Sequence, residues 1–318
     1  MMRRYGRELS VAVSIVVLCL VMAVFAPGYF SGENLADLFL ANIPVLLIAL
    51  GMNMVILTGQ IDISVGSMFA VCGIVAGVLS KAGMPVLVAG ICAVVAGAVM
   101  GSINGALVAY VRVPSIVATL ATMVALRDGL RWATQGAWVS DLPPGFQWLG
   151  LSQGSYPILI AVTTVSFVAA AGWGLRNLRA GRAIYATGSN MEAARLSGID
   201  TNLYTYGVFA VTGALTGIAA VLNSVRFNQI PSNAGLGLEM KVIAAVVVGG
   251  TAVTGGSGSV AGTVLGVILL GAIGPALTFL GVSAYWERAL QGAIILVAVV
   301  VEAVRERAER RIASGDGA

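Results

Sequence analysis

The chain has 318 residues, of which 58% are hydrophobic and only 10% are charged, and its mean hydropathy is +0.94. A soluble domain carries about 25% charged residues. This composition therefore excludes a soluble globular protein and predicts an all-α integral membrane protein.

The N-terminal apolar run follows a basic start, as in a signal peptide, but uncharged sequence extends from Leu9 to Gly32 without a clear cleavage site. Because many more apolar runs follow, this first run is predicted to be a transmembrane helix. Charges, glycines and prolines divide residues 1–318, read as one polytopic domain, into about ten spans of bilayer-crossing length. The predicted cores are 10–26, 38–57, 62–80, 85–110, 114–130, 155–175, 203–224, 240–253, 259–280 and 286–304.

The positive charges predict the orientation of these spans. An even number of spans puts both termini on one side of the membrane. If that side is the cytoplasm, it receives twelve of the 18 lysines and arginines, as the positive-inside rule requires. Residues 176–202 are then cytoplasmic and residues 131–154 external. The external segment holds three tryptophans, which belong either to an interfacial aromatic belt or to a docking surface for an external partner.

The stretch ILTGQIDISVGSM, residues 56–68, places polar residues between two apolar runs. Gly59 interrupts the helical pattern, and ionisable residues such as Asp62 rarely face lipid. One interpretation is a break that shapes or gates a translocation path; the other is that Asp62 caps the next helix through its first-turn N–H groups. In-membrane amides either bind solute hydroxyls or join helices. The candidate path or gate residues are Asn53, Gly59, Gln60, Asp62, Ser64 and Asn104.

Two spans carry glycines at every fourth position, which places each set on one helix face and lets backbones approach closely. These spans are five apart and so antiparallel, which predicts an inverted repeat relating spans 2–5 to spans 7–10. A second glycine-rich break, over residues 249–258, does not correspond to the first break under this repeat. The predicted helix-packing glycines are Gly97, Gly101 and Gly105 in the fourth span and Gly258, Gly262 and Gly266 in the ninth.

The cytoplasmic segment contains a predicted helix of about two turns. Ser189 and Glu192 have the spacing of a capping box at its start. Gly198 occupies the position of a C-terminal glycine at its end. So short a helix is marginal alone, so it either packs on its own protein or docks onto a partner.

Three motifs in this chain resemble those of the permease subunits of ribose-type ABC importers. Glu192-Ala193-Ala194, three residues and Gly198 match the E-A-A-x-x-x-G pattern of the coupling helix, which implies that Ser189, Glu192, Ala193, Ala194 and Gly198 dock onto an ATPase subunit. ILTGQIDISVGSMFAV resembles the family's T-G-G-I-D-L-S-V-G-S signature, with Gln60 for glycine and Ile63 for leucine. GLGLEMKVIAAVVVGGTAVTGGSGSVAGTVLG resembles its C-terminal signature. The resemblance covers nearly the whole chain and is closest to the rhamnose and autoinducer-2 branches.

This resemblance implies an importer permease in the bacterial inner membrane for a small sugar-like solute. Its implied partners are an ABC ATPase subunit, a second permease that is either identical or different, and an external solute-binding protein. The chain has no phosphate-binding loop, so ATP and Mg²⁺ belong to the ATPase subunit, and this chain is expected to bind no cofactor or metal, to have no catalytic residue and to contact no nucleic acid. The alternative is a ten-span secondary transporter driven by an ion gradient, which has no need of an ATPase-docking helix.

Overall fold

The computed structural model describes residues 2–152 and 154–283, together with 286–287, 289–290, 292–293, 296–297 and 300. Most of the predicted tenth span and the arginines at 305–311 lie outside the described residues. The elements are α1 (Met2–Phe25), η1 (Pro27–Phe30), α2 (Gly32–Leu57), α3 (Val65–Lys81), α4 (Val86–Ala109), α5 (Ser115–Thr134), η2 (Gln147–Gly150), α6 (Ser155–Asn177), α7 (Arg179–Ser189), α8 (Met191–Leu196), α9 (Thr201–Ser224), α10 (Leu238–Val248) and α11 (Val260–Phe279).

These elements form an all-α membrane protein. Six of the described helices are long and apolar enough to cross a bilayer, namely α1, α2, α4, α6, α9 and α11. Three further predicted spans fall on α3, α5 and α10. α3 and α10 have only 17 and 11 residues, and α5 carries three charged residues near its C-terminal end. The sequence did not predict α7 as a helix, because Gly181 and Gly188 are poor helix formers, although its buried residues share one face.

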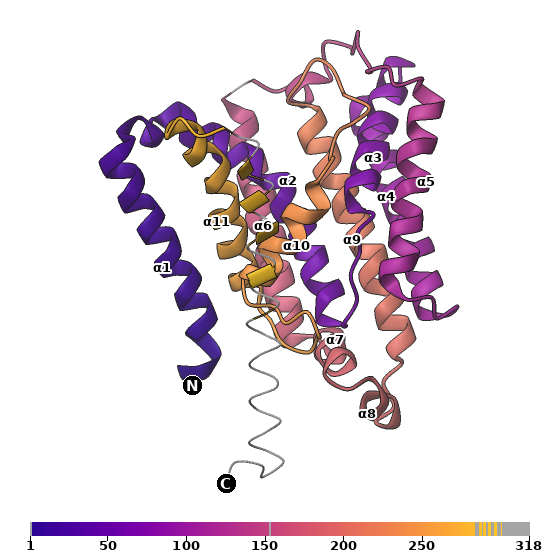
Figure 1. The fold of residues 1–318 in the computed structure, drawn as a ribbon. Coiled ribbons are helices and arrows are strands. Elements are labelled where there is room, and N and C mark those ends of the chain that lie inside the picture. The colour runs from indigo at the N-terminus through magenta and orange to yellow at the C-terminus, as the bar shows by residue number, and fades with distance from the viewer. Residues whose placement is uncertain are drawn as a thin grey trace.

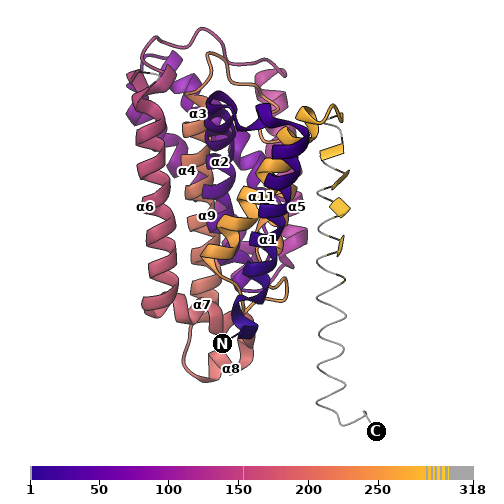
Figure 2. The ribbon, with the colours of Figure 1, turned by 90° about the vertical axis from the view of Figure 1, so that its left-hand side faces the viewer.

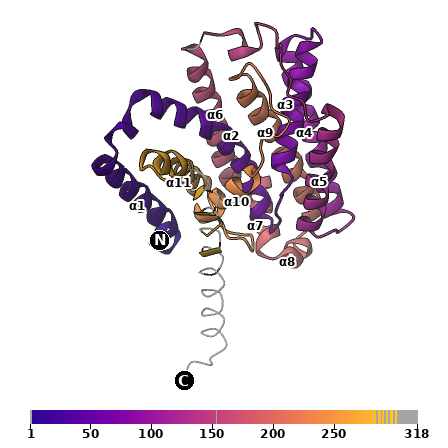
Figure 3. The ribbon, with the colours of Figure 1, turned by 45° about the horizontal axis from the view of Figure 1, so that its top comes forward.

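α2 and α9 form the centre of the bundle, and the other helices surround them (Figures 1 and 3). α2 is apolar around its whole circumference, which is typical of a helix buried on all sides. Its most apolar window is 78% buried, compared with 11% for α1, which lies at one edge of the bundle. α4 and α5 lie at the opposite edge (Figure 1).

Glycines bring α4 and α9 into direct backbone contact. Gly97, Gly101 and Gly105 all face α9, where a side-chain carbon on any of them would overlap the α9 backbone. The reciprocal residue on α9 is Gly213, which lies against Gly97 and Gly101. Lipid gives helices little reason to associate, so close van der Waals contact of this kind is what holds such a pair together.

The glycine set of the ninth span divides differently. Gly262 and Gly266 lie on α11 against the C-terminal half of α10, at Ala245 and Gly249. Gly258 was predicted to share this face, but α11 begins at Val260, so Gly258 lies in the loop before it and packs on Thr251. The spacing of four residues therefore gave a wrong prediction for Gly258. The Ser259 side chain caps α11, so the helix and its periodicity begin only after Gly258.

Two membrane segments are broken in the middle. After α2 ends, residues 58–64 run back in extended form, and α3 occupies only the upper half of the bundle (Figure 1). After α9, residues 225–237 turn back in the same manner, and α10 occupies the lower half. At 1.5 Å per residue, helices of these lengths reach only about 25 and 16 Å, short of the about 30 Å hydrocarbon core.

The α4–α9 contact gives a first prediction. Gly213→Ala should lower the free energy of unfolding by about 1–3 kcal/mol, because the added methyl group forces the two backbones apart. Gly207→Ala on the same helix is the matched control, because nothing lies within 4 Å of the added carbon, and it should be neutral or stabilising. Thermal unfolding of the purified permease in detergent measures both. Equal melting temperatures for the two variants would contradict the contact.

Candidate functional site

The helices α7 and α8 lie at the same end of the bundle as the start of α1 (Figures 1 and 2). α8 is the two-turn helix that the sequence predicts, but its cap differs from the prediction. The side chain of Asn190 caps the helix by accepting a hydrogen bond from the Ala193 N–H at 2.9 Å. The predicted capping box of Ser189 and Glu192 is therefore wrong. Ser189 is the last residue of α7, and its hydroxyl donates to the Tyr185 carbonyl at 2.9 Å.

The end of α8 follows the expected pattern. Gly198 has a φ of +80°, in the left-handed region that favours glycine. The chain then turns into α9, and the guanidinium of Arg195 donates to Thr201 at 2.7 Å and Asn202 at 2.9 Å. These contacts fix the orientation of α8 relative to α9.

One face of α8 is open. Ala194 is buried against the rest of the chain, whereas Glu192 and Ala193 are exposed. Leu196, the last residue of α8, is 86% exposed. An apolar side chain this exposed on a well-capped helix favours docking onto a partner over packing on its own protein.

The C-terminal turn of α7 meets the two glycine-rich breaks in one place, which we call the glycine junction and define as residues 57–59, 188–189 and 255–258. The Gly256 N–H donates to the Leu57 carbonyl at 2.9 Å, and the Tyr185 hydroxyl donates to the Gly258 carbonyl at 2.9 Å. Gly188 has no room for a side chain, because an added carbon would overlap the Leu57 carbonyl and lie 2.6 Å from the Gly256 nitrogen.

The glycine junction also reaches the first helix. Ser259, which caps α11, donates its hydroxyl to the carboxylate of Glu8 on α1. α8 is thus connected through α7 to the end of α2 and to the loop between α10 and α11, and Ser259 continues this connection to the start of α11 and to α1. The sequence predicts both breaks but does not indicate that they touch. Gly188 was missed altogether, and the only signal for it is the run of small residues in ATGSN.

The broken segment 58–64 is held by a buried polar network. One oxygen of Asp62 accepts hydrogen bonds from the Ser64 N–H at 2.9 Å and the Ser64 hydroxyl at 2.6 Å. Because α3 begins at Val65 with Ser64 as its cap position, Asp62 does not cap the first-turn N–H groups as predicted. It closes a turn just before the helix instead. Asn104 on α4 then donates to the Ser64 hydroxyl at 2.8 Å, and Thr122 on α5 donates to Asn104 at 2.7 Å.

Most of the candidate path residues are buried in this conformation. Asp62, Ser64 and Asn104 are 0% exposed, and so is Asn53. The side-chain amide oxygen of Asn53 accepts a hydrogen bond from the Thr251 hydroxyl at 2.7 Å, which joins α2 to the loop after α10. These side chains therefore act as contacts between helices. Of the six candidates, Gly59 is exposed and Gln60 is half-buried.

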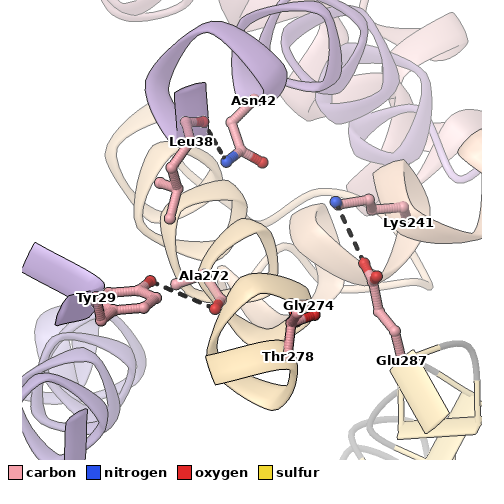
Figure 4. Close-up of polar contacts among 8 residues, drawn as sticks. All are labelled: Tyr29, Leu38, Asn42, Lys241, Ala272, Gly274, Thr278 and Glu287. Carbon is pink, nitrogen blue, oxygen red and sulfur yellow. Dashed lines mark hydrogen bonds and ion pairs between the residues drawn. The ribbon is translucent and has the colours of Figure 1, made fainter. Parts of the chain in front are cut away.

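A second polar cluster joins α2, α10, α11 and residues 286–287 (Figure 4). Lys241 and Glu287 form an ion pair at 3.4 Å, with side chains 23% and 26% exposed. The Glu287 carboxylate lies against Gly274 on α11. One turn earlier, Gly271 lies against the amide of Asn42, which donates to the Leu38 carbonyl at 2.7 Å. Charges within a membrane protein are usually paired in this way.

The opposite end of the bundle is covered by the predicted external segment. Val139 pairs with Ile230, the Trp148 N–H donates to the Val225 carbonyl at 2.7 Å, and Lys81 pairs with Asp141 at 3.5 Å. Trp132 and Trp138 are 79% and 57% exposed. The segment thus packs over the loop that follows α9 while leaving two large aromatic side chains open.

Broken membrane helices, buried polar contacts at the breaks and an exposed capped helix at one end are features of a polytopic transport protein. The chain matches the family described as branched-chain amino acid transport system / permease component over residues 34–299. The chain belongs to that family.

Curated relatives narrow the class. The chain is 34% identical over 302 residues to the autoinducer 2 import system permease protein LsrC of Salmonella typhi, covering 93% of this chain and 86% of that protein. LsrC of Yersinia pseudotuberculosis serotype O:1b (strain IP 31758) is 33% identical over 313 residues, covering 96% and 88%. No solved structure matches the chain. The family and these relatives identify the chain as a permease subunit of an ABC importer and not an enzyme.

The corrected cap of α8 can be tested directly. Asn190→Ala should destabilise α8 by about 1 kcal/mol, because the Ala193 N–H loses its acceptor. Ser189→Ala should leave α8 unchanged, since that hydroxyl bonds within α7. Amide hydrogen exchange of residues 191–196 in nanodiscs measures the difference. Faster exchange in Ser189→Ala but not in Asn190→Ala would instead support the predicted capping box of Ser189 and Glu192.

The network around residues 58–64 gives a further prediction. Asn104→Ala should lower the free energy of unfolding by about 1–3 kcal/mol, because Ser64 and Thr122 each lose a buried partner. The control is Asn177→Ala, whose amide is exposed and donates only to the Trp173 carbonyl, and whose loss should cost much less. Denaturation of both purified variants under identical conditions checks the prediction; similar losses would contradict a buried network.

Proposed function

We propose that this permease carries a small sugar-like solute into the cytoplasm, driven by ATP that a separate subunit hydrolyses. The observation that carries the proposal is the exposed helix α8, which is connected through α7 to the glycine junction. The curated relatives are named for autoinducer-2 import. The proposed solutes are therefore rhamnose, a ribose-type monosaccharide or autoinducer-2.

In this proposal the open face of α8 docks onto the ATPase subunit, with Glu192 and Ala193 at the contact. Ser189 sits at the hinge between α7 and α8, and Gly198 returns the chain to the membrane. Movement of α8 then passes through the tightly packed turn at Gly188 to the end of α2 and to the loop between α10 and α11. ATP and Mg²⁺ bind to the ATPase subunit, and this chain binds neither.

The proposed membrane fold has ten spans, with an inverted repeat that relates α2–α5 to α9–α11 and the segment 286–304. The packing of the described helices supports it. α4 packs against α9 as α11 packs against α2, and α3 packs against α9 as α10 packs against α2. Each half also has a long helix followed by an irregular segment and a short helix. Under this correspondence, residues 58–64 match residues 225–237. The lack of a match between the first break and residues 249–258 therefore no longer argues against the inverted repeat.

Both termini are proposed to be cytoplasmic. The start of α1 and the arginines of α7 and α8 lie at one end of the bundle, which supports a cytoplasmic assignment for that end. Residues 131–154 then face outward, where an external solute-binding protein delivers the solute. A second permease, identical or different, completes the membrane channel in the bacterial inner membrane. The alternative of an ion-driven secondary transporter leaves the exposed α8 without a role.

Vesicles reconstituted with the permease, its ATPase and its binding protein test this function. Uptake of the sugar-like solute should require internal ATP and should continue after the proton gradient is collapsed. Gly198→Val should reduce uptake at least about tenfold with normal membrane insertion, because a left-handed backbone is costly for a β-branched residue and the docking loop distorts.

Gly207→Val, on the open surface of α9, controls for the added side chain in the same assay. Uptake that persists without ATP and stops with an uncoupler would replace the importer proposal with the secondary transporter.

A further inference from the structure

The two short helices of the broken spans begin next to each other near the middle of the bundle (Figure 1). Gly66 in the first turn of α3 lies against Gly235, just before α10, and a side-chain carbon on Gly235 would lie 2.6 Å from the Gly66 carbonyl oxygen. Gly235 also has a φ of +69°. The N-terminal ends of α3 and α10 carry partial positive charge, so this contact concentrates positive potential inside the membrane.

Glu239, in the first turn of α10, supplies a negative charge at this point. Its carboxylate lies directly against Gly66, where any side chain would overlap it. One carboxylate oxygen, Oε2, is buried and has no hydrogen-bond partner among the described residues. The residue as a whole is only half-buried. Glu239 therefore holds a free acceptor oxygen that is closed off in this conformation, on a side chain that is otherwise partly exposed.

Arg127 on α5 interacts electrostatically with Glu239. Its guanidinium donates to the Ala234 carbonyl at 2.8 Å, which holds the turn before α10. Arg127 thus supports both the charge of Glu239 and the position of the α10 start. It acts through Glu239 and is a positioning residue.

Two other carboxylates of the bundle, Glu287 and Asp62, are differently placed. Glu287 pairs with Lys241 (Figure 4), and Asp62 is completely buried and bonded to Ser64. Asp62 also has an unpartnered oxygen, which is buried in this conformation like Oε2 of Glu239. Glu239 differs from Asp62 because the residue is partly exposed and lies where the two short helices meet, so that a movement of α3 relative to α10 would uncover its free oxygen.

The charge at this position constrains the chemistry of the solute. In several transporters, the starts of broken helices point at an anionic group of the substrate. Here a protein carboxylate already occupies that position. An ionised solute carboxylate or phosphate has no proton to donate to Glu239, whereas a hydroxyl group can donate a hydrogen bond to it.

We propose that Glu239 contacts the solute during translocation and accepts a hydrogen bond from a neutral polyhydroxylated compound. This inference rests on the proposed function and narrows its substrate class. It separates this permease from amino-acid carriers, whose solutes bear a carboxylate, although the family is described by branched-chain amino acid transport.

The test uses the complete importer in vesicles with L-rhamnose, D-ribose, autoinducer-2 and L-leucine as probes. Uptake by the unmodified importer identifies the best-transported probe, which should be one of the three hydroxylated compounds. Glu239→Gln should reduce its uptake at least about tenfold per inserted permease, and Glu239→Asp should restore part of it. Glu287→Gln is the control for loss of another carboxylate within the bundle, and its uptake should fall less.

Cysteine labelling separates solute contact from a folding role. In a chain with Cys19, Cys72 and Cys92 changed to alanine, Glu239→Cys should react with a membrane-impermeant thiosulfonate during ATP turnover. The transported probe should slow this reaction. Met240→Cys, the next residue on α10, should show no such protection, because its side chain points elsewhere.

Import of none of the four probes would overturn the proposed function. Import of a hydroxylated probe with no protection at Glu239→Cys, or with unchanged uptake by Glu239→Gln, would overturn the role of Glu239 alone. Preferred import of L-leucine would overturn the proposed substrate class.

Discussion

The hydrocarbon core offers no hydrogen bonds, and this constraint governs the whole molecule. Backbone groups inside the bilayer must be satisfied by the protein itself. A chain that breaks two of its spans, after α2 and after α9, must supply replacement partners. Residues 58–64 find theirs in Ser64, Asn104 and nearby hydroxyls: the Ile61 N–H, for example, bonds to the Ser115 hydroxyl at 3.2 Å. The buried polar residues are thus a consequence of the broken backbone.

Close approach is the second requirement. Because lipid is as apolar as the helix surfaces, backbones associate here through contact, and glycine permits it. The same residue type serves two different purposes. At Gly97 and Gly213 it joins α4 and α9 into a fixed unit. At Gly188 and Gly256 it brings the turn of α7 against the ends of two membrane helices, where a movement imposed on α8 would be transmitted with little slack.

The division between fixed and movable parts follows from these contacts. α9 shares extensive packed faces with both α2 and α4, so these three helices form one tightly packed group. α3 and α10 are short, and each is attached by an irregular segment. A transporter needs both properties, since alternating access is largely the movement of one group of helices against another around a fixed site. The contact of Gly66, Gly235 and Glu239 lies where the two short helices meet, so relative movement of α3 and α10 would change it first.

The sequence by itself determined the membrane environment, nine of the helical segments, the family and the short helix α8, because these depend on composition, local periodicity and short motifs. Gly198 belongs to this class, since a helix end is a local feature. Only the tertiary structure decided which glycines touch, that Asn190 rather than Ser189 caps α8, that Asn53 and Asn104 are buried contacts, and that Glu239 lies against Gly66. Most of those facts depend on residues far apart in the chain, such as Leu57 and Gly256, whose proximity is set by helix packing and leaves no trace in local sequence. The cap of α8 is instead a choice between neighbouring residues, and it depends on where α7 ends.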